Sequence, residues 1–145
     1  NRRPVDFAPL TDFSDPADVL LKTWRDGRVK VFVTETALAF RNAHKQVFEI
    51  GEYVPLETRG ARSENVFAFL RHHESSYVIV IVPRLMAGLS EQAQWGDTRV
   101  LLPEGAALVG WKNKLTGERL QSTGGALSVS SILSRFPVAL LSCVA

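Results

Sequence analysis

Hydrophobic positions along the chain follow two different rhythms, and the change between them lies near Gly51. Before Gly51, mostly apolar residues recur at intervals of three and four, as on one face of a helix. They are Val29, Phe32, Thr36, Phe40, Ala43 and Val47. This spacing predicts a helix from Arg28 to about Phe48 that ends at Gly51. A shorter helix is predicted over residues 16–25, because Ser14-Asp15-Pro16 is a start signal and Asp26-Gly27 is a stop signal.

After Gly51 the apolar runs are short and turn residues separate them. The predicted strands are Tyr53–Glu57, Val66–Arg71, Tyr77–Val82, Arg99–Leu102, Leu108–Trp111, Arg119–Gln121, Ala126–Val129 and Val138–Val144. The predicted turns are Arg59-Gly60, His72 to Ser76, Pro103-Glu104-Gly105, Thr116-Gly117 and Gly124-Gly125, and Ser130–Ser134 is a candidate helical turn. Many short strands with frequent turns are typical of an antiparallel β-sandwich or Greek-key sheet. We therefore expect a mainly β fold with N-terminal helices, divided into residues 1–50 and an all-β domain over residues 51–145.

Composition and charge are those of an ordinary globular protein. The 145 residues are 46% hydrophobic and 22% charged, which excludes a disordered chain. Lys and Arg total 17 against 15 Asp and Glu, and the basic residues are scattered, so we expect no nucleic-acid partner. The single cysteine, Cys143, excludes an internal disulfide framework and a multi-cysteine zinc site, and its apolar surroundings predict a buried side chain.

The start of the chain lacks the pattern of a targeting segment. Asn1-Arg2-Arg3-Pro4 has no initiator Met, and no charged segment followed by an apolar stretch marks a signal peptide. No apolar run reaches the roughly 18 residues that a membrane span needs. We therefore expect a cytoplasmic protein with no membrane partner, and a chain that is one piece of something longer.

Candidate catalytic groups have simpler explanations as structural residues. Retaining glycosidases need two carboxylates a few ångströms apart. Aspartates are available, but most of them lie beside Pro, Gly, Ser or Thr, where Asp usually caps a helix or closes a turn: Asp6, Asp12, Asp15, Asp18, Asp26 and Asp97. His72 and His73 are adjacent on a predicted hairpin, so they point to opposite faces and cannot easily share a metal. We predict no catalytic residue, no metal site and no cofactor.

Two segments are candidates for sugar contact. In Trp95-Gly96-Asp97-Thr98, an exposed Trp95 could stack on a sugar ring and Asp97 could accept hydrogen bonds from hydroxyls. The alternative, which we favour, is a turn in which Trp95 packs on the sheet. Arg2 and Arg3 offer forked donors for carboxylates or sugar hydroxyls, or they form a solvated terminus.

Several motifs, taken in order along nearly the whole chain, resemble the malto-oligosyltrehalose synthases of bacteria. The N-terminal motifs are Asn1-Arg2-Arg3-Pro4-Val5-Asp6-Phe7 and Trp24-Arg25-Asp26-Gly27-Arg28-Val29-Lys30, followed by Gly51-Glu52-Tyr53-Val54-Pro55-Leu56. Further along come Val66-Phe67-Ala68-Phe69, Val80-Ile81-Val82-Pro83-Arg84-Leu85, Trp95-Gly96-Asp97-Thr98, Leu115-Thr116-Gly117 and Phe136-Pro137-Val138-Ala139-Leu140-Leu141. Each motif alone is weak, and the ordered set is specific.

The resemblance implies a parent enzyme of the α-amylase family of glycoside hydrolases. Such an isomerase converts the reducing-end α-1,4 glucosyl bond of a maltodextrin into an α,α-1,1 bond, without a cofactor, in trehalose biosynthesis. Its Asp nucleophile and Glu acid/base lie on the strands of a (β/α)8 barrel, and this sequence has no alternating strand–helix units.

The resemblance therefore implies that the chain is a C-terminal fragment that is inactive alone and meets maltodextrin through a barrel domain outside it. Residues 1–50 would be the terminal loop and last helices of that barrel, and Arg2 and Arg3 would lie on its catalytic face. The exposed helices could drive self-association. The alternatives are a free-standing carbohydrate-binding β-sandwich and an interaction module without sugar affinity.

Overall fold

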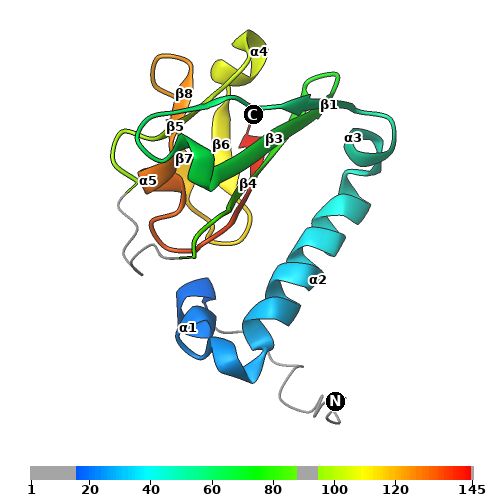
Figure 1. Cartoon of the computed structure of the whole chain (residues 1–145). Helices are drawn as coiled ribbons and strands as arrows, with labels where there is room; N and C mark the ends of the chain where they lie inside the picture. Colours follow the sequence, from blue (N-terminus) through cyan, green and yellow to red (C-terminus); the bar gives the residue numbers. More distant parts are fainter. Residues whose placement is uncertain (1–15, 88–94, 145) are drawn as a thin grey trace.

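The computed structural model of the chain describes residues 16–87 and 95–144 (Figure 1). Its helical part contains α1 (Ala17–Lys22), the 3-10 turn η2 (Trp24–Asp26), α2 (Arg28–Ala43) and α3 (Lys45–Glu49). The helix predicted over residues 16–25 ends earlier than expected, at Lys22, and the 3-10 turn η2 follows it. Gly27, with a left-handed φ of 84°, ends that turn at the predicted stop. The helix predicted over residues 28–48 is broken at His44, where φ is −121° and the backbone leaves the helical region. Gly51 ends α3 as predicted, because its N–H donates back to the carbonyl of Gln46.

The strands of the described residues form two antiparallel sheets. The larger sheet has the order β1-β3-β4-β9-β6-β7, and the smaller has the order β2-β5-β8. The strands of the larger sheet are β1 (Glu52–Pro55), β3 (Val66–His73), β4 (Ser76–Pro83), β6 (Gly110–Asn113), β7 (Arg119–Leu120) and β9 (Ala139–Val144). Those of the smaller sheet are β2 (Thr58–Arg59), β5 (Arg99–Leu101) and β8 (Ala126–Ser128). Each predicted strand has a counterpart, although the strand predicted over residues 108–111 begins only at Gly110.

The described chain is mixed rather than mainly β, because about equal numbers of its residues lie in helices and in strands. N-terminal helices followed by antiparallel sheets are confirmed. The extra helical content lies partly in the loops of the β region. The predicted turn at Pro103 opens the short helix α4 (Glu104–Ala107), and the predicted helical turn near Ser130 is α5 (Val129–Ile132). A 3-10 turn, η3 (Ser63–Asn65), precedes β3.

The middle strands of the larger sheet, β4 and β9, are buried on both faces, as β4 shows. Ile79 and Ile81 point to one face, and Val78 and Val80 point to the other. On the first face the core joins both sheets and includes Leu70, Ile79, Ile81, Val100, Trp111, Leu127, Val129, Ile132 and Leu141. On the second face a separate apolar cluster joins the sheet to the helices and includes Ala17, Phe40, Val47, Val78, Leu115, Phe136 and Leu140. The six-stranded sheet is therefore the middle layer between the smaller sheet and the helices (Figure 1).

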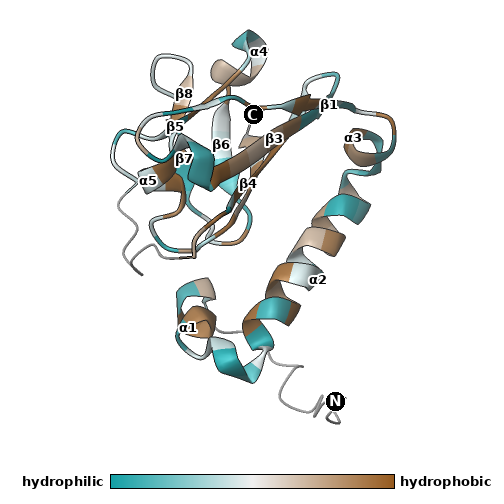
Figure 2. Cartoon of the chain, viewed as in Figure 1, coloured by the Kyte–Doolittle hydropathy of each residue, from teal (hydrophilic) through white to brown (hydrophobic). Residues whose placement is uncertain are grey.

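The apolar stripe of α2 and α3 packs within its own chain. Phe40 and Val47 are buried, and Val29 and Phe32 are half-buried. The Phe32 ring meets Phe136 edge to face at 6.3 Å. The helix is amphipathic along its length, with hydrophobic and hydrophilic residues alternating around it (Figure 2). No helix of the described ranges is long and apolar enough to cross a membrane.

Arg71 on β3 attaches the end of α3 to the sheet. Its Nε donates to the Val47 carbonyl at 3.0 Å, and its Nη2 donates to the Gly51 carbonyl at 2.9 Å. The Val47 carbonyl lies in the last turn of α3, where backbone oxygens lack helical partners, and the Gly51 carbonyl lies in the link between α3 and β1. The guanidinium therefore satisfies exposed backbone acceptors and sets where the helices meet the β domain.

Candidate functional site

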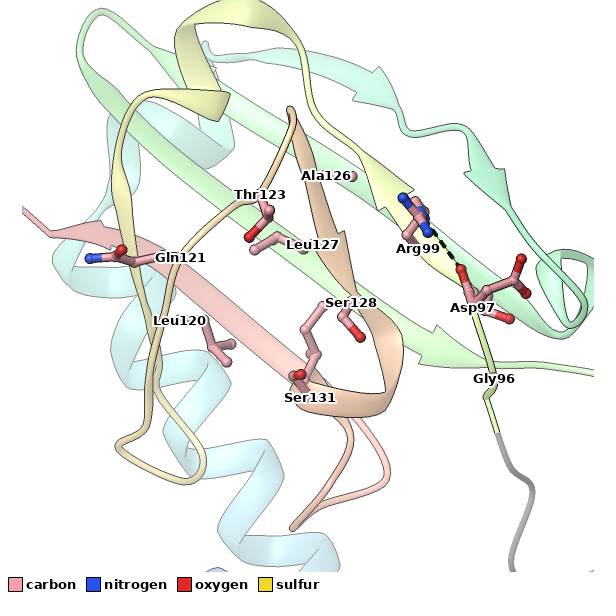
Figure 3. Close-up of a pocket in the computed structure, with 12 residues that line it drawn as sticks. Gly96, Asp97, Arg99, Leu120, Gln121, Thr123, Ala126, Leu127, Ser128 and Ser131 are labelled. Carbon is pink, nitrogen blue, oxygen red and sulfur yellow. Dashed lines mark hydrogen bonds between the residues drawn. The ribbon is translucent and has the colours of Figure 1, made fainter.

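A groove of about 400 Å³ lies beside the smaller sheet (Figure 3). Its walls come from the turn before β5, from β5 and β8, from α5 and from the segment around the end of β7. The polar residues of its wall are Asp97, Thr98, Arg99, Gln121, Thr123, Ser128 and Ser131. In Figure 3, Asp97 and Arg99 lie on one side of β8, and Leu120 and Gln121 lie on the other.

The turn over residues 95–98 forms one end of this groove. The Thr98 N–H donates to the Trp95 carbonyl at 2.9 Å, and Gly96 takes the left-handed φ of 54° that such a tight turn favours. Asp97 Oδ1 accepts the Ala61 N–H at 2.9 Å, and the Thr98 hydroxyl accepts the Arg62 N–H at 3.0 Å. Two polar side chains therefore hold this turn against the loop that follows β2.

Gly60 makes that close contact possible. It has a φ of 108°, and a Cβ built on it would lie 2.7 Å from the Cα of Thr98 and 2.8 Å from the carbonyl oxygen of Asp97. Both neighbours are backbone atoms, which cannot move aside as a flexible side chain can. A glycine is required here both by conformation and by space.

The groove offers chemistry for a polyhydroxylated ligand. It presents a carboxylate, a guanidinium, an amide and several hydroxyls, which together supply hydrogen-bond donors and acceptors. The Arg99 Nε donates to the backbone carbonyl of Asp97 at 3.3 Å, which orients the guanidinium along the wall (Figure 3). The Ser128 and Ser130 hydroxyls lie 2.8 Å apart at the start of α5. No aromatic ring is among the lining residues that the structure describes, so a sugar would be held by hydrogen bonds rather than by stacking.

Of the two predicted sugar-contact residues in the turn over residues 95–98, only one lines the groove. Asp97 lies in the groove wall, whereas the half-buried Trp95 packs against the core between the two sheets. Their contact with sugar stays a prediction. Arg2 and Arg3 lie outside the described residues. Sequence reasoning missed the lining residues Arg99, Gln121, Thr123, Ser128 and Ser131, which come together only through the pairing of β5 with β8 and the return of the chain after β7.

Comparison with known proteins decides the relationship of the chain. No protein-family model matches it. Two curated proteins named "Putative maltooligosyl trehalose synthase", from two strains of Mycobacterium tuberculosis, are each 30% identical to it over 141 residues. The chain is homologous to a segment of these two proteins. The alignments cover 97% of this chain and 16% of each relative, so the chain spans about a sixth of their length. This match confirms the resemblance that the ordered motifs indicated.

Several acidic side chains among the described residues have structural partners. Asp26 accepts the Arg28 backbone N–H and the Arg28 Nε, each at 2.9 Å, and these bonds, the backbone one first, lower the pKa of the carboxyl below its usual value. Asp18 lies 3.5 Å from Arg135 Nη2, and Glu52 lies 3.1 Å from His72 Nε2. Within residues 16–87 and 95–144, no three His, Cys, Asp or Glu side chains gather as metal ligands would.

A second hollow, of about 320 Å³, lies where α2 and α3 meet the β3–β4 turn. His44, Lys45, His73 and Glu74 contribute to its walls. The His44 ring packs against the Phe40 ring, with centres 4.3 Å apart and planes tilted by 37°, so this histidine supports the helix junction. The hollow therefore belongs to the joint between helices and sheet, and the groove beside the smaller sheet is the better candidate site.

Proposed function

We propose that the chain is the C-terminal segment of a malto-oligosyltrehalose synthase, an isomerase of the α-amylase family. The whole protein would convert the reducing-end α-1,4 glucosyl bond of a maltodextrin into an α,α-1,1 bond in trehalose biosynthesis, in the cytoplasm. The observation that supports this proposal is the match along 97% of the chain to relatives named as maltooligosyl trehalose synthases. Most of each relative lies outside the match, which leaves room for a separate catalytic domain.

In this proposal the segment supports the enzyme and supplies no catalytic carboxylate. A retaining double displacement needs two carboxylates facing the scissile bond, and barrel enzymes place them at the C-terminal ends of barrel strands. The strands described here are antiparallel and form no strand–helix repeats. We assign α1, α2 and α3 to the last helices of the barrel, and the two sheets to the sandwich or Greek-key domain that follows it. The reaction requires no cofactor, and it requires the barrel to exclude water, so that the freed glucose attacks the intermediate.

Two residues of the segment are proposed to reach the active site of the whole enzyme. Arg2 and Arg3 would lie on a loop at the catalytic face, where an arginine fork can hold sugar hydroxyls. The test is Arg3→Ala in the full-length enzyme. Activity on maltodextrin should fall at least ~10-fold, about 1.4 kcal/mol of transition-state stabilisation, while the melting temperature changes little. Unchanged activity, or activity that falls only in step with stability, would withdraw this assignment.

A second function is favoured by the polar groove. A carbohydrate-binding module would hold maltodextrin there through Asp97, Arg99 and the neighbouring hydroxyls. Calorimetric titration of the isolated chain with maltoheptaose distinguishes the two functions. Binding that Arg99→Ala abolishes supports the module, because this exposed side chain contributes little to the core. If the isolated chain does not bind maltoheptaose, the carbohydrate-binding function is contradicted, and the proposal that the chain is a segment of the synthase stands alone.

Activity of the isolated chain tests the proposed division of labour. Incubation of residues 1–145 with maltopentaose should yield neither a trehalosyl product nor new reducing ends. Turnover above that of a heat-denatured control would contradict the proposal, because it would place catalytic groups inside this segment.

A further inference from the structure

The helices cover only part of one face of the larger sheet. Over β4 and β9 the apolar side chains of that face, including Val78 and Leu140, are buried beneath α2 and α3. Over β1 and β3 the same face lies open, and Tyr53 and Phe67 keep 46% and 41% of their surface exposed. The attachment of α3 through Arg71 marks the boundary, because Arg71 is followed along this face of β3 by Phe69 and Phe67.

The open area is an aromatic patch, defined here as Tyr53, Phe67 and Phe69. The Tyr53 and Phe69 rings have centres 5.1 Å apart, and the Phe67 and Phe69 rings have centres 5.9 Å apart. The strand register places Pro55 and Val80 opposite Phe69, and Val82 opposite Phe67. Three adjacent aromatic rings with aliphatic neighbours form a continuous apolar surface, which is the kind of surface that marks an interaction site.

We propose that the aromatic patch is the docking surface for another part of the same, longer polypeptide, which seats the apolar side of a helix on β1 and β3. This inference rests on the proposed function, because it requires the chain to be a segment of a larger enzyme. The relatives supply the material for such a helix, since the match covers only 16% of their length. The aromatic patch lies on the same face of the sheet as α2 and α3, which already pack on the neighbouring strands. A further helix beside them would cover the rest of that face.

A protein occupant fits the patch better than a sugar does. The rings are tilted by 35° and 51° to each other, so they form an uneven surface into which the side chains of a helix can interdigitate. Two of the three rings are phenylalanines, which have no hydroxyl to offer. Arg71, which shares this face, already donates to two backbone carbonyls. The patch is thus apolar and poor in hydrogen-bonding groups among the described residues, as the centre of a protein interface is.

Hydroxyl-radical footprinting of the full-length polypeptide that contains these residues tests the proposal. Oxidation of Tyr53, Phe67 and Phe69 is measured by mass spectrometry, and each rate is divided by the rate of the same peptide after unfolding. Leu108, which is 84% exposed on the loop after α4, serves as the accessible reference. The patch should be protected at least about 5-fold more than Leu108. Equal labelling of the patch and Leu108 would overturn the proposal. Protection that appears only when maltoheptaose is added would also overturn it, because the patch would then be a sugar-binding surface.

A matched pair of variants in the full-length polypeptide supplies an independent readout. The double variant Tyr53→Ser and Phe67→Ser should release the segment, so that limited proteolysis separates it from the rest at least about 10-fold faster. Leu108→Ser should leave the proteolysis rate unchanged. Near-UV circular dichroism of the wild type and the variants checks that the segment stays folded, and unchanged proteolysis of a folded double variant would overturn the docking.

Failure of the proposed function is distinguishable from failure of the docking. The proposed function would be contradicted if the full-length protein formed no trehalosyl product from maltopentaose. Protection of the patch in such a protein would still support the docking surface. Trehalosyl product together with an accessible patch would support the function and overturn the docking.

Discussion

Removal of the Phe40 ring tests whether the helices and the sheets form one folded unit. Phe40 keeps only 7% of its surface exposed and lies in the cluster that joins α2 to β4 and β9. Its ring packs edge to face on Phe48 at 6.1 Å and against His44 at 4.3 Å, and Lys114 Nζ lies 5.3 Å from its centre. Phe40→Ala therefore removes packing within the helices and packing against the loop after β6.

The expected cost follows from the burial of the ring. Truncation of a buried phenylalanine to alanine costs about 3–5 kcal/mol, and Phe40 belongs at the lower end because the long side chain of its neighbour Lys114 can move into the space that the ring leaves. We expect a loss of about 3 kcal/mol in the free energy of unfolding, which for a chain of this length lowers the melting temperature by roughly 10 °C. Thermal and urea unfolding followed by circular dichroism measure both values.

Leu38→Ala on the same helix is the matched control. Leu38 keeps 52% of its surface exposed, so its truncation should cost less than about 1 kcal/mol in the isolated chain. If Phe40→Ala were as mild as Leu38→Ala, α2 would not be packed on the sheet in solution. The helices would then be a separate unit, and the reasoning from the apolar stripe would be wrong.

Three further expectations follow from local structure. The lowered pKa of Asp26 means that its bonds to Arg28 stabilise the folded chain above the ordinary pKa of 3.8 and are lost as the pH falls below it. Asp26→Asn should therefore lower the melting temperature at pH 7 and leave it unchanged near the acid end, and an equal effect at both pH values would contradict this. Gly60→Ala should destabilise the chain by at least ~2 kcal/mol in urea unfolding, whereas Gly117→Ala, also at positive φ but with open space around it, should cost only about 1 kcal/mol. Similar costs at the two glycines would show that the contact with Thr98 is not tight. The isolated chain should also self-associate through the part of the apolar stripe that its own fold leaves half-buried, at Val29 and Phe32, and a monomer at all concentrations in light scattering would contradict this.

Local sequence patterns predicted most of the helices and strands, because the spacing of apolar residues shows which side chains of a segment are buried. The two largely apolar runs over residues 66–71 and 77–82, with turn residues between them, predict a hairpin, and the β3–β4 pair is the longest pairing among the described strands. The glycine at position 27 predicts a helix end because its left-handed conformation is a local property. Local patterns could not reveal the break at His44, since the apolar spacing continues through it into α3. The two-residue strand β2 is likewise too short to show an alternation.

The candidate site was much less predictable, because its contacts join residues far apart in the chain. Asp97 was recognised as a turn residue, but its bond to the Ala61 N–H spans 36 positions. Arg99 and Gln121 share the groove only because of how the chain returns after β7. The exposure of Phe67 and Phe69 could not be predicted either. The sequence shows that these side chains point to the opposite face from the main core, but not whether another layer covers that face.

The central claim is that these 145 residues form the C-terminal part of an enzyme that makes trehalosyl ends on maltodextrins. The most direct test is incubation of the full-length polypeptide with maltopentaose, with the products followed by proton NMR. The account predicts loss of the reducing end and appearance of an α,α-1,1 linkage with the full-length polypeptide, and neither change with residues 1–145 alone. A full-length polypeptide that leaves maltopentaose unchanged, or that releases only shorter reducing sugars, would contradict it.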